Sequence, residues 1–196
     1  MPLCPVANPW YLVLGPRQYL AGVEGAHPFF ARVTTLVDPI RDRVGGPMRI
    51  IAIGDGGTWI WPRSAFVAAP DDEVVEILDF FHAIAYLGDL AKAMHWNETV
   101  TEPWLKDLAD QLLEKAPDPV IETLAGMHAR GTEQKKILNQ TLYSFEENAT
   151  RMDYPTYTAR GWPLGSGIVE SACHLVSNLR IKSLACAGPM TVCRRS

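Results

Sequence analysis

The front of the chain alternates between short apolar runs and amphipathic stretches, which predicts strands and helices in turn. Arg49–Ile53 is nearly all apolar and short, which indicates a buried strand. Residues 74–79 form a second such run after an acidic turn, and Tyr19–Val23 is a further strand candidate. Apolar residues at helical spacing predict a helix over residues 24–44, which Pro39 should break or bend. Strand and helix in this order indicate an α/β fold.

From residue 80 the pattern becomes helical and stays so to about residue 157. Prolines and a glycine are expected to separate its segments, namely Pro103, Pro117, Pro119 and Gly131. Residues 161–167 then predict a loop, and residues 168–181 a last helix. The all-helical middle is therefore an insertion into the α/β part or a second lobe.

Composition narrows the possible partners. The chain has 196 residues, of which 47% are hydrophobic, and 18 basic against 22 acidic residues give a formal charge of -4. Because strong nucleic-acid binders carry a basic excess, DNA contact would need a local patch. The four cysteines form no C-x-x-C pair, which argues against structural zinc and a disulfide framework. With no membrane-length apolar run and no signal peptide, a cytoplasmic protein without a membrane partner is expected.

Two acidic residues lie where a turn meets a regular element. Asp55 follows the Arg49–Ile53 strand and precedes two glycines, and Glu170 follows Gly165-Ser166-Gly167 at the start of the last predicted helix. Carboxylates at strand ends and helix starts can converge on one point, and Mg²⁺ prefers a few carboxylate oxygens while leaving positions for water and phosphate. Metal-held carboxylates are the working groups of enzymes that cut and join nucleic acid.

Each candidate also has a purely structural interpretation. Asp55 fits a turn former, and Glu170 fits a first-turn acid favoured by the helix dipole, worth roughly 0.3–1 kcal/mol. Asp79 and His82 are three residues apart, so the carboxylate could hold the imidazole, or Asp79 could cap the helix. Arg151, Arg180 and Lys182 suit phosphates, although such residues on a helix face are usually just solvated.

Trp59 and Trp61 follow Asp55 closely and have two interpretations. They could stack on bases, or they could pack the core beside the strand end, and the large area of an indole favours packing.

Four separate stretches, taken together, resemble the DDE transposases of bacterial insertion sequences, in the branch related to Mutator-like elements. The first two are Ile53-Gly54-Asp55-Gly56-Gly57-Thr58-Trp59-Ile60-Trp61 and Ile77-Leu78-Asp79-Phe80-Phe81-His82-Ala83. The others are Asn148 with Arg151, Met152 and Tyr154, and the run from Pro163 to Cys173. The resemblance covers roughly residues 19–182.

The resemblance implies a fold, a site and a reaction. The fold would be α/β, a partial ribonuclease-H-like sheet with a large all-helical insertion: residues 19–79 as the first part of the core, 80–160 as the insertion and 161–182 as the catalytic helix. Asp55 would be the second acid and Glu170 the third, both metal ligands, with Asp79 and His82 supporting them and Arg151, Arg180 and Lys182 contacting DNA. Two Mg²⁺ or Mn²⁺ ions would activate a water or 3′-hydroxyl for phosphoryl transfer on the DNA ends of the element.

The sequence departs from the family at both ends. The first acid is expected on a strand before the stretch equivalent to residues 19–23, yet residues 1–37 contain no aspartate. Residues 1–18 are proline-rich and predict an irregular segment, so truncation at the N-terminus and inactivity alone are expected. At the other end, residues 183–189 can be encoded by codons that also carry the usual family continuation, Ser-Gly-Met-Arg-Trp-Ser, in a shifted reading frame. The shifted frame begins at the third base of the Ser183 codon. Residues 183–196 are therefore interpreted as an out-of-frame tail.

Three hypotheses about function remain after these comparisons of residues. The favoured one is a truncated, inactive transposase that has an exposed strand edge and a tendency to self-associate. The second is a non-catalytic module that binds and regulates intact transposase through its helical part. The third is an unrelated metal-dependent phosphohydrolase that uses Asp55, Asp79 and Glu170.

Overall fold

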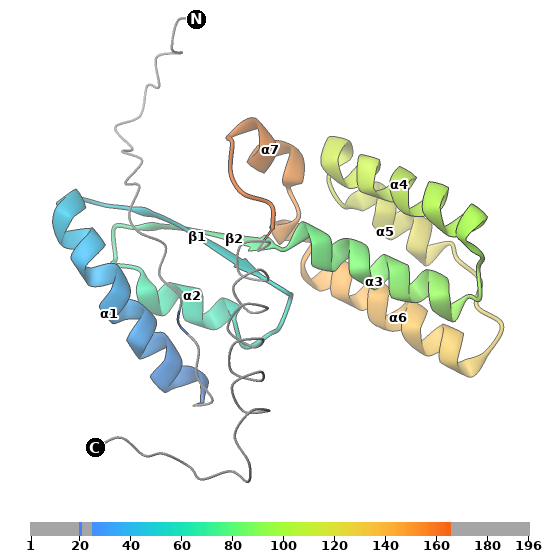
Figure 1. The fold of residues 1–196 in the computed structure, drawn as a ribbon, viewed down its shortest axis with the longest axis horizontal. Helices are drawn as coiled ribbons and strands as arrows, with labels where there is room; N and C mark the ends of the chain where they lie inside the picture. The colour runs from blue at the N-terminus through green and yellow to red at the C-terminus, as the bar shows by residue number, and fades with distance from the viewer. Residues whose placement is uncertain (1–19, 21–24, 166–196) are drawn as a thin grey trace, which may run out of the picture. The chain divides into compact units, whose positions relative to one another are not determined.

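The computed structural model of the chain describes residue 20 and residues 25–165, which are coloured in Figure 1. Over these residues the fold is mixed α/β, with two strands and predominantly helical structure around them. The elements before the helical part are α1 (Ala26–Val44), β1 (Arg49–Gly54), α2 (Trp61–Val67) and β2 (Glu73–Leu78). The later elements are α3 (Phe80–Ala93), α4 (Glu98–Lys115), α5 (Asp118–Ala125), α6 (Thr132–Glu147), the 3-10 turn Ala149–Arg151 and α7 (Tyr154–Ala159).

The two strands pair in parallel, with α2 in the connection between them. Their register aligns Arg49 with Glu73 and Gly54 with Leu78, so both strands end at the same edge. Parallel strands need such a crossover connection. The strand–helix–strand order confirms the α/β arrangement that the sequence predicts. A ribonuclease-H-like sheet has further strands; the predicted strand Tyr19–Val23 lies outside the described residues except for Leu20.

The predicted break at Pro39 is wrong, because Pro39 lies inside the continuous helix α1, and a bend there stays a prediction. Pro39 removes a hydrogen bond to the carbonyl of Thr35, and both residues are exposed, so water can take the released carbonyl. Helix α4 contains Pro103 for the same reason, because Thr99 one turn earlier is also exposed. The predicted separation at Pro103 is therefore wrong, whereas α5 begins after Pro117 and α6 after Gly131 as expected.

The hydrophobic core lies among the later helices and continues to the end of β2. Helices α3, α4, α5 and α6 contact one another in sequence order, α6 also contacts α3, and Figure 1 shows them side by side. The fully buried side chains come from every one of these elements, among them Ile77, Leu87, Leu112, Val120 and Phe145. Helix α1 instead has no fully buried residue and contacts α2.

Candidate functional site

Asp55 lies in the turn directly after β1. Gly54 ends the strand and is buried, while Asp55 is exposed. Its Oδ1 accepts a hydrogen bond from the Gly57 backbone N–H at 3.0 Å, so the side chain closes its own turn. The turn-forming interpretation is confirmed. Because the carboxylate remains exposed at the carboxyl end of a strand, a bound ligand can reach it.

One hydrogen bond joins the helical part to this turn. The Tyr86 hydroxyl of α3 donates to the Asp55 carbonyl at 2.8 Å. Gly56 has φ +90, and a Cβ placed there would lie 3.1 Å from Leu78 Cδ1 and 3.6 Å from Asn148 Nδ2. Burial, together with the Asp55 charge, raises the pKa of Tyr86, so its hydroxyl stays a neutral donor. The Tyr86 hydrogen bond therefore ties the Asp55 turn to α3, and Asn148 lies near Gly56.

Asp79 caps α3. Only 1% of it is exposed, and its Oδ1 accepts from the backbone N–H of Phe81 at 2.8 Å and, more weakly, from that of His82 at 3.4 Å. The capping interpretation is confirmed, and the predicted strand over 74–79 ends at Leu78 because Asp79 begins the helix. The half-buried His82 shares this turn, and a carboxylate–imidazole pair stays a prediction.

The last described residues return to the same edge of the sheet. The Phe80 N–H donates to the Leu164 carbonyl at 2.8 Å, and the Asp79 N–H donates to the Gly54 carbonyl at 2.8 Å. A Cβ placed on Gly165 would lie 3.2 Å from Asp79 Oδ1. The backbone of Asp79 and Phe80 therefore bonds to both Gly54 and Leu164 at this edge of the sheet. Glu170, Arg180 and Lys182 lie outside the described residues.

Arg151 forms a cross-link between the end of the helical part and the sheet. Its Nε pairs with Glu76 Oε2 on β2 at 2.8 Å, and its guanidinium lies 4.7 Å from the centre of the Trp61 ring. Ser64 of α2 donates to the other oxygen of Glu76 at 2.7 Å. These contacts give Arg151 a structural role, and DNA contact through it stays a prediction.

The two tryptophans have different environments. Trp61 is 7% exposed and belongs to the core cluster, which confirms the packing interpretation for that residue. Trp59 is 50% exposed, and its ring contacts Phe30 of α1 edge to face at 6.3 Å. Packing against the core therefore accounts for Trp61, whereas Trp59 contacts α1 and stays half exposed.

The sequence does not indicate directly that Tyr86 contacts the Asp55 turn or that Asn148 lies near Gly56. Tyr86 lies seven residues after Asp79, and this spacing places both on one face of a helix. That spacing is the one signal for Tyr86, and it becomes informative only once Asp79 is known to begin α3. Asn148 is among the residues that carry the family resemblance, but its position at the Gly56 turn depends on the tertiary fold.

The described residues offer only part of the ligand set that a hard cation needs. Asp55 offers an exposed carboxylate, which is the ligand type that Mg²⁺ and Mn²⁺ prefer. Over residues 20 and 25–165, no three histidine, cysteine, aspartate or glutamate residues group closely enough to hold a metal ion. Further ligands would have to come from the rest of the chain, where Glu170 lies, or from another chain.

Comparison with protein-family models, curated proteins and solved structures finds no match to this chain. None of the helices among the described residues is both long and apolar enough to cross a membrane. The case for a function therefore rests on the residues and their arrangement.

Proposed function

We propose that this chain is part of a DDE-type DNA transposase, in which Asp55 and Glu170 are the second and third metal-binding acids. The observation that carries the proposal is the convergence at the carboxyl edge of β1 and β2. The Asp55 turn lies there, and so does Gly165, from which the chain continues to Glu170. In parallel α/β sheets, ligands bind at this edge.

The segment between Gly165 and Glu170 is short. Glu170 is five residues after Gly165, and five residues can span at most about 17 Å. When bound, paired cations would activate the attacking oxygen and stabilise the leaving oxygen of a DNA phosphodiester. The described part contributes the Asp55 carboxylate at the sheet edge and the Tyr86 hydrogen bond that joins its turn to α3, and Glu170 would supply the second carboxylate.

The chain alone is expected to be inactive, because two-metal phosphoryl transfer needs a third carboxylate and no aspartate occurs before Asp38. Asp38 lies in α1, which precedes β1, rather than on a neighbouring strand. Incubation with plasmid DNA and Mn²⁺ should therefore give no nicking above that of Asp55→Ala. Nicking that Asp55→Ala abolishes would contradict the proposed inactivity.

Mn²⁺ binding tests the paired acids directly, by titration calorimetry on the full chain. We expect Asp55→Asn and Glu170→Gln each to weaken Mn²⁺ binding by about tenfold or more, which is about 1.4 kcal/mol. Because both act on one ion, the double variant should bind little worse than either single variant. Asp89→Asn, an exposed carboxylate on α3, is the matched control and should bind as the unmodified chain does. Independent, additive losses, or binding unaffected by Asp55→Asn, would contradict the shared site.

A further inference from the structure

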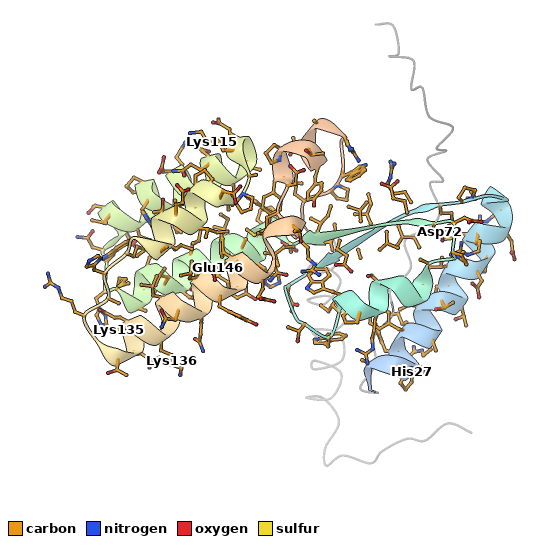
Figure 2. All side chains as sticks on the ribbon, turned by 180° about the vertical axis from the view of Figure 1, so that it is seen from behind. His27, Asp72, Lys115, Lys135, Lys136 and Glu146 are labelled. Atoms are coloured by element: carbon orange, nitrogen blue, oxygen red, sulfur yellow. The ribbon has the colours of Figure 1, made fainter. Side chains whose placement is uncertain are left out.

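A cavity of about 280 Å³ is lined by residues of α1 and α2. Its described lining consists of His27, Phe30, Ala31, Thr34 and Arg63. The lining is mainly apolar, with one guanidinium and one imidazole, and the described residues contribute no carboxylate to it. Figure 2 shows His27 at the beginning of α1, at the opposite end of that helix from Asp72.

Trp59 connects the cavity to the Asp55 turn. On one side its ring contacts Phe30, which lines the cavity, with ring centres 6.3 Å apart. On the other side its Nε1 would lie 2.9 Å from a Cβ placed on Gly57, and Asp55 Oδ1 would lie 3.2 Å from the same point. Arg63 also lines the cavity and donates from Nη1 to the Trp59 carbonyl at 3.0 Å. Trp59 therefore lies between Phe30, which lines the cavity, and the Asp55 turn.

We propose that this cavity, with Trp59 at its side, binds one unpaired base of a DNA strand whose backbone passes the Asp55 turn. The inference rests on the proposed function and adds a base-binding subsite to it. Its size is the first argument: the volume falls just below the roughly 300–1,000 Å³ of pockets that enclose drug-sized ligands, so it suits one planar base.

The chemistry of the surface is the second argument. Bases stack on aromatic side chains irrespective of sequence, and a half-exposed indole offers such a surface. Arg63 supplies a positive charge for the phosphate attached to the base, and the described lining offers no carboxylate to repel that phosphate. The subsite would therefore bind base and phosphate together, with stacking on the Trp59 indole as the contact to the base.

Fluorescence anisotropy on the full chain tests the subsite in buffer containing EDTA and little salt. The two ligands are a short oligothymidylate and the same oligonucleotide with abasic residues. The unmodified chain should bind the thymidylate more tightly. Trp59→Ala, which removes the indole, and Ala31→Trp, which fills the cavity, should each weaken thymidylate binding about 5- to 100-fold, the range expected for losing the stacking of one base. Both should leave abasic binding unchanged.

Tyr143→Ala is the matched control, because Tyr143 on α6 is 61% exposed and lies outside the cavity lining. It should bind both oligonucleotides as the unmodified chain does. Two results would overturn the proposal: equal affinity for the two oligonucleotides, or thymidylate binding that neither Trp59→Ala nor Ala31→Trp weakens. The same results are expected if other residues of the chain fill the cavity. Since EDTA removes cations, this assay and the Mn²⁺ titration of Asp55 can fail independently.

Discussion

At the scale of single residues, Gly165 shows how a turn glycine also serves close packing. A Cβ there would lie 2.6 and 2.8 Å from two ring atoms of Phe81, closer than side chains normally approach. Phe81 is itself 62% exposed, so its ring is held mainly by this neighbour and by Phe80, 5.7 Å away. The residue that leads toward Glu170 is therefore packed against the first turn of α3.

Gly165→Ala should lower the free energy of unfolding by about 0.5–1.5 kcal/mol, because the added methyl forces the exposed Phe81 ring away from its preferred rotamer. In the Phe81→Ala background the same substitution should cost much less, since the ring that it meets is gone. Urea unfolding of the four proteins measures this coupling. Gly88→Ala is the control, because that helical glycine has nothing within 4 Å of its Cβ position, and it should stabilise by about 0.5–1 kcal/mol. Strictly additive effects of Gly165→Ala and Phe81→Ala would show that the two residues do not meet.

The sequence predicts local features of the site well and long-range ones poorly. An apolar run followed by Asp and two Gly is a local signal, and it correctly places Asp55 in a turn after a strand. Tyr86 contacts that turn from 31 residues away in the chain, and Tyr154 contacts β2 from 76 residues away. No periodicity encodes such pairs, because they depend on how α3 and α7 pack against the sheet.

At the scale of elements, proline was the least reliable sequence signal. Pro39 and Pro103 both lie inside helices, on exposed faces where water can satisfy the carbonyl that loses its partner. The true break between α3 and α4 occurs at His95, which has φ 58, followed by the cap Asn97. The cost of a proline inside a helix depends on whether its face is exposed to water, so the sequence alone does not predict that cost.

Asp72 joins three elements at the turn before β2, where Figure 2 labels it. Its carboxylate pairs with Arg41 of α1 at 2.6 Å and accepts from the backbone N–H groups of Met48 at 2.8 Å and Ala69 at 2.9 Å. Burial alone would raise the pKa of Asp72, but the two backbone hydrogen bonds and the Arg41 charge together lower it below 3.8. This carboxylate therefore anchors α1, which has no fully buried residue of its own.

Asp72→Asn should lower the free energy of unfolding by about 1–2 kcal/mol at neutral pH, a value reduced for the partial exposure of Arg41. Since the folded pKa is depressed, the stabilisation is present above the unfolded pKa of about 3.9 and is lost as pH falls through the lower folded pKa. Urea unfolding at pH 7 and at pH 3 should therefore show the variant and the unmodified chain converging at the acidic end. Asp71→Asn, the exposed neighbour, should have little effect, and an unchanged difference at pH 3 would contradict the linkage.

At the scale of the whole described part, two tyrosine hydroxyls connect the helices to the end of the sheet. Tyr154 of α7 is fully buried and donates to the Leu78 carbonyl at 3.0 Å, and Tyr86 of α3 donates to the Asp55 carbonyl. Burial raises the pKa of both groups, and the Asp79 charge adds to the effect at Tyr154. Each can donate its hydrogen bond only while it keeps its proton, so the junction of helices and sheet depends on neutral tyrosines.

Alkaline pH should therefore weaken this junction. Because the folded pKa of each tyrosine is raised above the ordinary 10.0, its contribution is fully present below about pH 10 and declines as pH rises above that value. A group that keeps its proton in the folded chain and loses it in the unfolded chain gives a slope of up to about 1.4 kcal/mol per pH unit. Between about pH 10 and 11.5, Tyr154→Phe should reduce the slope of the unfolding free energy against pH by nearly that amount, because the substitution removes the titrating hydroxyl. The control Tyr143→Phe, at an exposed site, should leave the slope unchanged. Urea unfolding over this range measures the slope, and equal slopes for Tyr154→Phe and the unmodified chain would show that the hydroxyl titrates in the folded chain much as it does in water.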